Sequence, residues 1–149
     1  MTTPYATVDE ANAYFAERLR TDAWDDASAE DQEKALKMAT RAIERLNFAG
    51  EKADENQEMQ FPRGEDTEVP QDVKDACCEE ALALLSVVTT STQSPADAAR
   101  IKRKKIGDAE EEYDTSLVSD ATMNGMLSYE AWVLLTPYFR DPRNLDLDR

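Results

Sequence analysis

Three helix start signals, each followed by a stripe of apolar residues, constrain the fold of this chain more than any other feature. In the first, the Thr7 hydroxyl can accept a hydrogen bond from the backbone N–H of Glu10, whose carboxylate can reach back to Thr7. This capping box predicts a helix that begins at Val8 and ends near Arg20. Its expected apolar face recurs at three- and four-residue steps and consists of Val8, Ala11, Phe15 and Leu19.

The second and third signals are a serine cap and a first-turn proline. Ser28 precedes acidic residues that suit the positive end of a helix dipole, and the segment from Asn47 to Gly50 supplies a stop. Pro70 fits the first turn of a further helix that runs to about Thr89. The two expected stripes are Leu36, Ala39, Ile43 and Leu46, and then Val73, Cys77, Ala81, Leu84 and Val88. A Phe61-Pro62-Arg63 loop separates these helices.

A fourth helix is expected near the carboxyl end. Ser128 can cap a helix from Tyr129 onward, and Trp132, Leu135 and Phe139 form its stripe. Pro137 either kinks this helix or ends it near Leu135. We expect Trp24 and Trp132 to lie in packing contacts.

Between the third and fourth helices lies a strongly charged segment. Residues 101–106 are mainly basic, residues 109–113 are mainly acidic, and Gly107-Asp108 between them is typical of a hairpin turn. The predicted fold is therefore mainly α: a bundle of three long helices plus a C-terminal helix, with a small β-hairpin near 101–113 and an extended C-terminal tail. We expect one domain over residues 1–139, with the hairpin inserted at about 100–114, and an arm over 140–149.

The basic run permits two interpretations. Lys and Arg contacts to phosphate dominate non-specific DNA affinity. However, the formal net charge of −15 and the pI near 4.3 repel a polyanion, and the acidic strand can neutralise the run. We favour structural pairing within the hairpin, or a protein–protein contact, over a DNA contact. The predicted contact residues are Lys102, Arg103, Lys104, Lys105, Glu110, Glu111 and Glu112.

The tail from Arg140 to Arg149 is polar and lacks a helical stripe. Such a segment has little to bury, which favours disorder. Alternatively, Leu145 and Leu147 anchor it on a partner as an added strand. The sequence leaves both interpretations open.

Composition argues against enzymatic chemistry. With no histidine, the chain cannot build a Ser-His-Asp or Cys-His nucleophile, and its four glycines form no phosphate-binding loop. The acidic clusters do not fit a calcium loop. We therefore expect no catalytic residue, cofactor or metal.

Cys77 and Cys78 are helix neighbours, and we expect a buried Cys77 with a more exposed Cys78.

No apolar run approaches the roughly 20 residues needed to span a bilayer. The N-terminus lacks the basic and apolar regions of a signal peptide. These features predict a protein that is made and used in a cytosol, without a membrane partner.

The chain contains an ordered set of segments: Ala6 to Ala11 with Tyr14-Phe15, Trp24, Lys34 to Ile43, Leu46 to Gly50, Phe61-Pro62-Arg63, and Pro70 to Leu85. This set resembles the head-tail connector, or adaptor, proteins of tailed bacteriophages. The resemblance covers about Tyr5 to Leu85 well and the later segments more loosely, and it carries no catalytic residue. Some relatives carry a label that likens them to a primosomal single-stranded-DNA-binding protein. With this resemblance, we expect the charged residues of the 101–113 hairpin to contact an adjacent subunit or a tail protein.

The resemblance implies a structural protein of the virion that assembles as a ring, typically of twelve copies, beneath the portal. It also implies a portal-binding C-terminal segment and an opposite face that receives a stopper or tail protein. The location would be the portal vertex or neck, and the host cytoplasm during assembly. DNA would pass through the channel without specific binding. The expected portal-binding residues are Arg140, Arg143, Leu145, Leu147 and Arg149.

Two other classes of function stay open. One is a single-stranded-DNA-binding accessory protein of replication, although the chain lacks a basic groove with interleaved aromatic residues. The other is a small regulatory or scaffolding domain.

Overall fold

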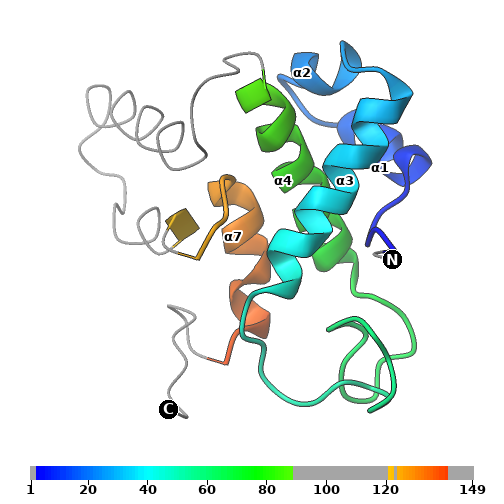
Figure 1. The fold of residues 1–149 in the computed structure, drawn as a ribbon, viewed down its shortest axis with the longest axis vertical. Coiled ribbons are helices and arrows are strands. Elements are labelled where there is room, and N and C mark those ends of the chain that lie inside the picture. Colours follow the sequence, from blue (N-terminus) through cyan, green and yellow to red (C-terminus); the bar gives the residue numbers. More distant parts are fainter. Residues whose placement is uncertain (1–2, 89–120, 123, 141–149) are drawn as a thin grey trace.

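Two long helices that pack against each other form the centre of the protein in the computed structural model, which describes residues 3–88, 121–122 and 124–140. These helices are α3 (Ala29–Glu44) and α4 (Gln71–Val88). On one side of the pair, α7 (Tyr129–Leu135) packs against α4 and continues into a 3-10 helix, η1 (Thr136–Tyr138). On the other side lies α1 (Val8–Phe15), and the short α2 (Asp22–Asp25) also contacts α4 (Figure 1).

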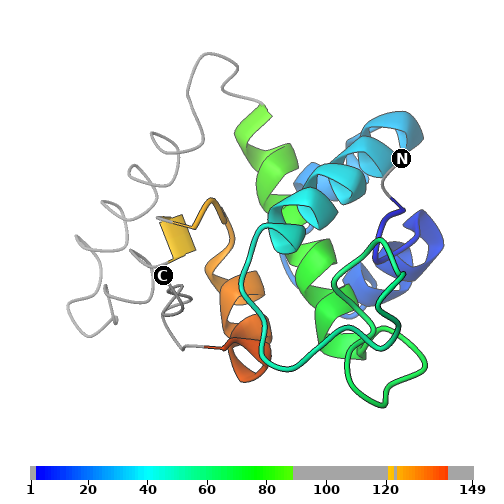
Figure 2. The ribbon, with the colours of Figure 1, turned by 60° about the horizontal axis from the view of Figure 1, so that its bottom comes forward.

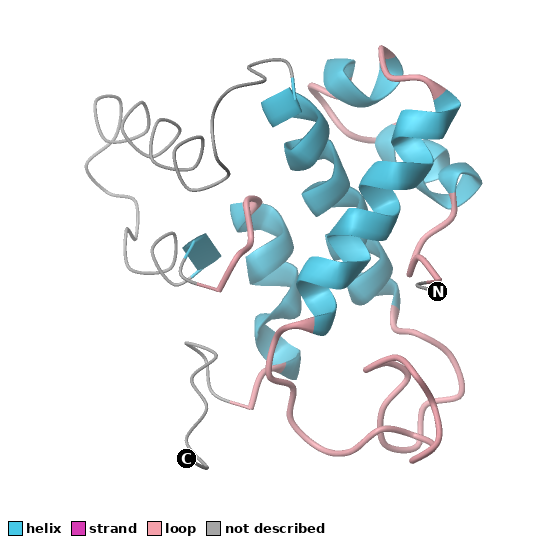
Figure 3. Cartoon of the chain, viewed as in Figure 1, coloured by secondary structure: helices cyan, strands magenta, loops and turns pink. Residues whose placement is uncertain are grey.

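The expectation of a mainly helical protein is confirmed. Within the described residues there is no strand, only isolated bridges that pair Phe48 with Phe139 and Lys52 with Arg63 (Figure 3). Only α3 and α4, with 16 and 18 residues, are long helices in the described part of the chain, since α1 has 8 residues. The predicted hairpin at 101–113 lies outside the described residues.

The predicted helix starts are confirmed, because each capping side chain makes its expected bond. Glu10 N donates to Thr7 Oγ1 over 3.1 Å, and the Glu10 carboxylate accepts from Thr7 N over 3.0 Å. Ser28 accepts from Asp31 N, and Ser128 accepts from Ala131 N. α7 ends at Leu135, where Pro137 favours the tighter 3-10 turn because it has no N–H to continue the α-helix.

The predicted end of the first helix is wrong. α1 stops at Phe15, five residues before Arg20, and Leu19 is 81% exposed rather than part of the apolar face. The physical reason is a tertiary contact, since the Arg18 side chain bonds both to Glu79 on α4 and to the Leu19 carbonyl. Arg20 then adopts φ +62°, a left-handed conformation that cannot continue a right-handed helix.

The prediction of a more exposed Cys78 is also wrong. Cys77 and Cys78 are 0% and 2% exposed, because α4 lies at the centre of the fold and is covered on several sides. Burial raises the pKa of the Cys77 thiol to about 11, so this thiol stays protonated and unreactive at neutral pH.

One apolar cluster extends through the described fold and includes residues from Tyr5 to Phe139. The two tryptophans lie within it as expected, and Trp24 and Trp132 are 1% and 0% exposed. Trp24 comes from α2, a short helix that the sequence did not predict. At the lower end of the molecule, the long connection between α3 and α4 covers the cluster through Phe48 and Phe61 (Figures 1 and 2).

Candidate functional site

The residues predicted to contact partners fall mostly outside the described part of the chain. This holds for Lys102, Arg103, Lys104, Lys105, Glu110, Glu111, Glu112, Arg143, Leu145, Leu147 and Arg149. The structure places one of them, Arg140, which is exposed and follows the buried Phe139. Its backbone N–H donates to the Asn47 carbonyl over 3.3 Å. The predicted arm therefore leaves the body beside the end of α3.

The Phe61-Pro62-Arg63 segment holds the α3–α4 connection in place. The Arg63 guanidinium donates to the carbonyls of Ala49 and Gly50 over 3.0 and 2.6 Å, and also to those of Phe48 and Gln60. Phe61 is 3% exposed and packs edge-on against Phe48. Desolvation and the nearby Arg140 lower the pKa of Arg63. These residues are structural, because their polar groups face the protein's own backbone.

Tyr5, near the N-terminus, makes a second set of contacts that holds the α3–α4 connection. The Tyr5 hydroxyl donates to Glu44, and the Glu44 carboxylate accepts from the backbone N–H of Gln60 over 3.0 Å. Burial and the adjacent carboxylate raise the pKa of Tyr5 well above its usual value, so the hydroxyl stays neutral. Glu44 therefore acts as a structural acceptor.

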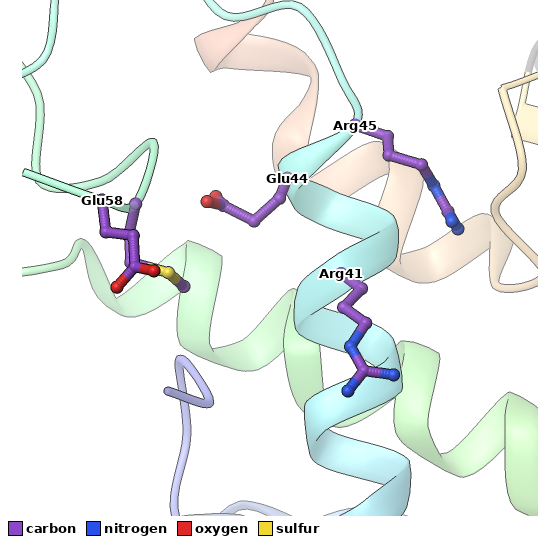
Figure 4. Close-up of a pocket in the computed structure, with 5 residues that line it drawn as sticks. Arg41, Glu44, Arg45 and Glu58 are labelled. Carbon is purple, nitrogen blue, oxygen red and sulfur yellow. The ribbon is translucent and has the colours of Figure 1, made fainter. Parts of the chain in front are cut away.

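The exposed surface beside this network contains an open depression with a volume of about 330 Å³. Its lining residues are Arg41, Glu44, Arg45, Glu58 and Met59, and Glu44 extends from α3 toward the loop that carries Glu58 (Figure 4). Arg41 and Arg45 lie one helical turn apart, are exposed, and form no ion pair in the described part of the chain. Met59 is partly buried and packs on the core.

The depression combines one apolar side chain, Met59, with two guanidinium groups and two carboxylates. An occupant that is partly apolar and carries an anionic group could pair with the guanidinium groups. Sequence reasoning missed this site. A usable signal was present, since Arg41 and Arg45 are four residues apart on the face of the predicted helix opposite its apolar stripe.

The turn between α1 and α2 is the other unusual exposed feature. Arg18 Nε lies 2.6 Å from Glu79 Oε2, and Arg18 Nη1 donates to the Leu19 carbonyl over 2.6 Å. Glu79 is only 3% exposed and also accepts from the Tyr14 hydroxyl. Burial and this carboxylate raise the pKa of Tyr14. The turn is thus fixed to α4 while the Leu19 side chain faces solvent.

The aromatic side chains offer little surface for stacking with nucleic-acid bases. In the described residues every phenylalanine and tryptophan is at most 7% exposed. The hydroxyls of Tyr5, Tyr14 and Tyr138 bond to carboxylates of the protein. Base stacking requires an exposed ring face beside a basic groove. Most aromatic rings of the described residues instead point into the core.

The described residues contain neither a candidate metal site nor a membrane-spanning helix. No group of three or more His, Cys, Asp or Glu side chains in that part of the chain could hold a metal ion. Among the same residues, no helix combines the length and the apolar character that crossing a membrane requires.

A comparison with protein families matches residues 3–138 to the family described as "Putative DnaT-like ssDNA binding protein". The match covers most of the chain, and the protein therefore belongs to this family. No curated protein and no solved structure matches the sequence.

Proposed function

We propose that this protein is a non-enzymatic structural protein of a phage virion, which forms a ring under the portal and joins it to the stopper or tail. The proposal rests on the ordered resemblance of Tyr5 to Leu85 to head-tail adaptors. It is supported by an acidic surface, since the net charge is −15. Such a surface suits a channel through which DNA slides without binding.

The placement of the aromatic rings is the single observation that favours this proposal over a DNA-binding role. Phe48 packs against both Phe61 and Phe139 in the core, and Trp132 lies tilted against Phe139 with ring centroids 4.6 Å apart. Rings that stabilise the fold in this way are not available to stack with bases.

A second candidate is a single-stranded-DNA-binding accessory protein of replication. The description of the family favours it, because the family is named for such binding. The exposed Arg41 and Arg45 could contact phosphates. However, the chain has 17 basic residues against 32 acidic ones, and we therefore rank this candidate second.

A binding measurement separates the two candidates. Fluorescence anisotropy of a labelled single-stranded oligonucleotide is followed at low salt and then with increasing salt. We expect no measurable binding even at low salt. Submicromolar affinity that falls steeply with salt would instead establish the accessory role, because phosphate contacts release counterions.

The arm is tested by deletion of Asp141 to Arg149. We expect the shortened protein to remain folded and to lose incorporation into portal-containing particles. Incorporation equal to that of the full chain would remove the arm from the proposal.

The charged segment is tested by the double variant Lys104→Glu with Lys105→Glu. We expect disrupted ring assembly or tail joining, because the substitutions reverse two of the predicted contact charges. If assembly is normal, the basic run is ordinary surface.

A further inference from the structure

We propose that the turn of residues 17–20 in one copy inserts Leu19 into the depression beside Met59 of a neighbouring copy. This contact would join successive subunits of the proposed ring, so the inference rests on the proposed function. It assigns an occupant to the depression and a role to the exposed turn.

The turn is built to present an apolar side chain. Leu19 is 81% exposed, although the backbone around it is held by Arg18, which bridges the buried Glu79 and the Leu19 carbonyl. Arg20 follows at φ +62°, which is uncommon for a residue other than glycine. Strained conformations of this kind persist where the surroundings impose them, and they concentrate at functional sites. An exposed leucine on a fixed turn would enter an interface with little loss of backbone freedom.

The depression is large enough to admit this side chain. Its volume of about 330 Å³ is some ten times the ~30 Å³ that a water molecule occupies in the liquid, and the leucine side chain has only four heavy atoms. The partly buried Met59 supplies a flexible apolar wall.

Charges of both signs surround both features, since Glu44 and Glu58 line the depression together with Arg41 and Arg45. Glu17 and Arg20 flank Leu19 and are exposed. Arg41 and Arg45 line the depression, form no ion pair within the described residues, and could receive Glu17 of the neighbour. Complementary charges fix the register of a contact and disfavour wrong partners.

The positions of the two features select a ring-forming contact. The turn joins α1 to α2 near the start of α3, whereas the depression lies where α3 ends (Figures 1 and 4). Two different patches of one chain that bind each other make a heterologous contact, and such contacts close into rings or extend into filaments. A symmetric dimer would require one patch that binds itself.

Cysteine cross-linking tests the contact directly. The double variant Leu19→Cys with Met59→Cys should give a ladder of disulfide-linked species on a non-reducing gel under assembly conditions. Each single variant should give none, because its cysteines do not meet across a heterologous contact. The native Cys77 and Cys78 are buried and would not contribute. A double variant without a ladder, in conditions where the wild-type chain assembles, would overturn the contact and leave the ring proposal intact.

A pair of matched substitutions tests the role of Leu19. Leu19→Glu should weaken self-association by at least about tenfold, since it places a charge in an apolar contact. Val133→Glu is the control, because Val133 is 41% exposed on α7 and belongs neither to the turn nor to the lining of the depression. Both variants should melt as the wild type does. Equal assembly of the two variants would overturn the inference, as would rings that persist in Leu19→Glu while portal or tail binding is lost. If the wild-type chain does not assemble even with portal-containing particles, the ring proposal fails and this contact fails with it.

Discussion

At the residue scale, the Glu80 side chain connects the centre of the fold to the start of α7. Glu80 lies on α4 and is 1% exposed. Its carboxylate accepts from the backbone N–H groups of Leu127 and Ser128 over 3.0 and 2.8 Å. The N–H groups that precede a helix have no partner within it, and a buried carboxylate satisfies them with charge-assisted bonds.

Replacing Glu80 should therefore lower the free energy of unfolding by more than an ordinary surface substitution does. We expect Glu80→Ala to lower the free energy of unfolding by about 3 kcal/mol, because two buried N–H groups lose their acceptor. Glu80→Gln keeps one acceptor oxygen and should cost less. Urea denaturation followed by circular dichroism measures both values. A loss below about 0.5 kcal/mol for Glu80→Ala would contradict this role.

At the element scale, capping side chains decide where the helices begin, whereas tertiary contacts decide where some of them end. The capping box at Thr7 and Glu10 starts α1, and Glu10 also bonds to Lys74 of α4 over 2.8 Å. The hydrogen bond from Lys74 lowers the pKa of Glu10. The start of α1 is thus fixed both by its own sequence and by its neighbour.

We expect Thr7→Ala to lower the free energy of unfolding by about 1 kcal/mol, the usual effect of losing an N-cap side chain. Thr21→Ala is a matched control, since Thr21 precedes α2 but its side chain makes no capping bond. Its expected cost is smaller. Thermal or urea unfolding of the two variants checks the difference, and equal costs would mean that the Thr7 bond contributes little.

At the scale of the whole molecule, residues from both ends of the described chain share one apolar cluster. Tyr5 packs on Phe61, Phe61 on Phe48, and Phe48 on Phe139. Leu135 of α7 is 0% exposed in the same cluster. Elements that share one core should unfold together.

This shared core can be tested with a single fluorescent reporter. In the described structure the indole N–H of Trp132 has no hydrogen-bond partner, so Trp132→Phe loses no bond there and leaves Trp24 as the remaining tryptophan. In that background, Leu135→Ala should cost about 2–5 kcal/mol and shift the Trp24 transition together with the circular dichroism transition. Separate transitions would show that α7 and the N-terminal helices unfold independently.

Local sequence predicted the helix starts and the apolar faces of α3 and α4 well. These features depend on neighbouring residues, such as Ser28 with Asp31 or the spacing of Leu36, Ala39 and Ile43. It failed at Arg20 and Cys78, where the result depends on distant residues. The ion pair of Arg18 with Glu79 fixes the turn that follows α1, so the helix does not extend to Arg20. The central position of α4 buries Cys78.

The candidate sites were less predictable than the helices. Leu19 continues the apolar spacing of α1, but the helix ends at Phe15 and leaves Leu19 exposed. The depression joins Arg41 and Arg45 of α3 to Met59 of a loop, and no local pattern predicts that proximity.

The sequence by itself determined the helical class, the helix starts and the acidic character of this protein, because capping, periodicity and charge are local or summed properties. Only the tertiary structure decided where α1 ends, that Cys78 is buried, and which surfaces remain for partners. The physical reason is that burial and pairing depend on contacts between residues far apart in the chain. Arg18 with Glu79 and Glu80 with Ser128 are two such contacts.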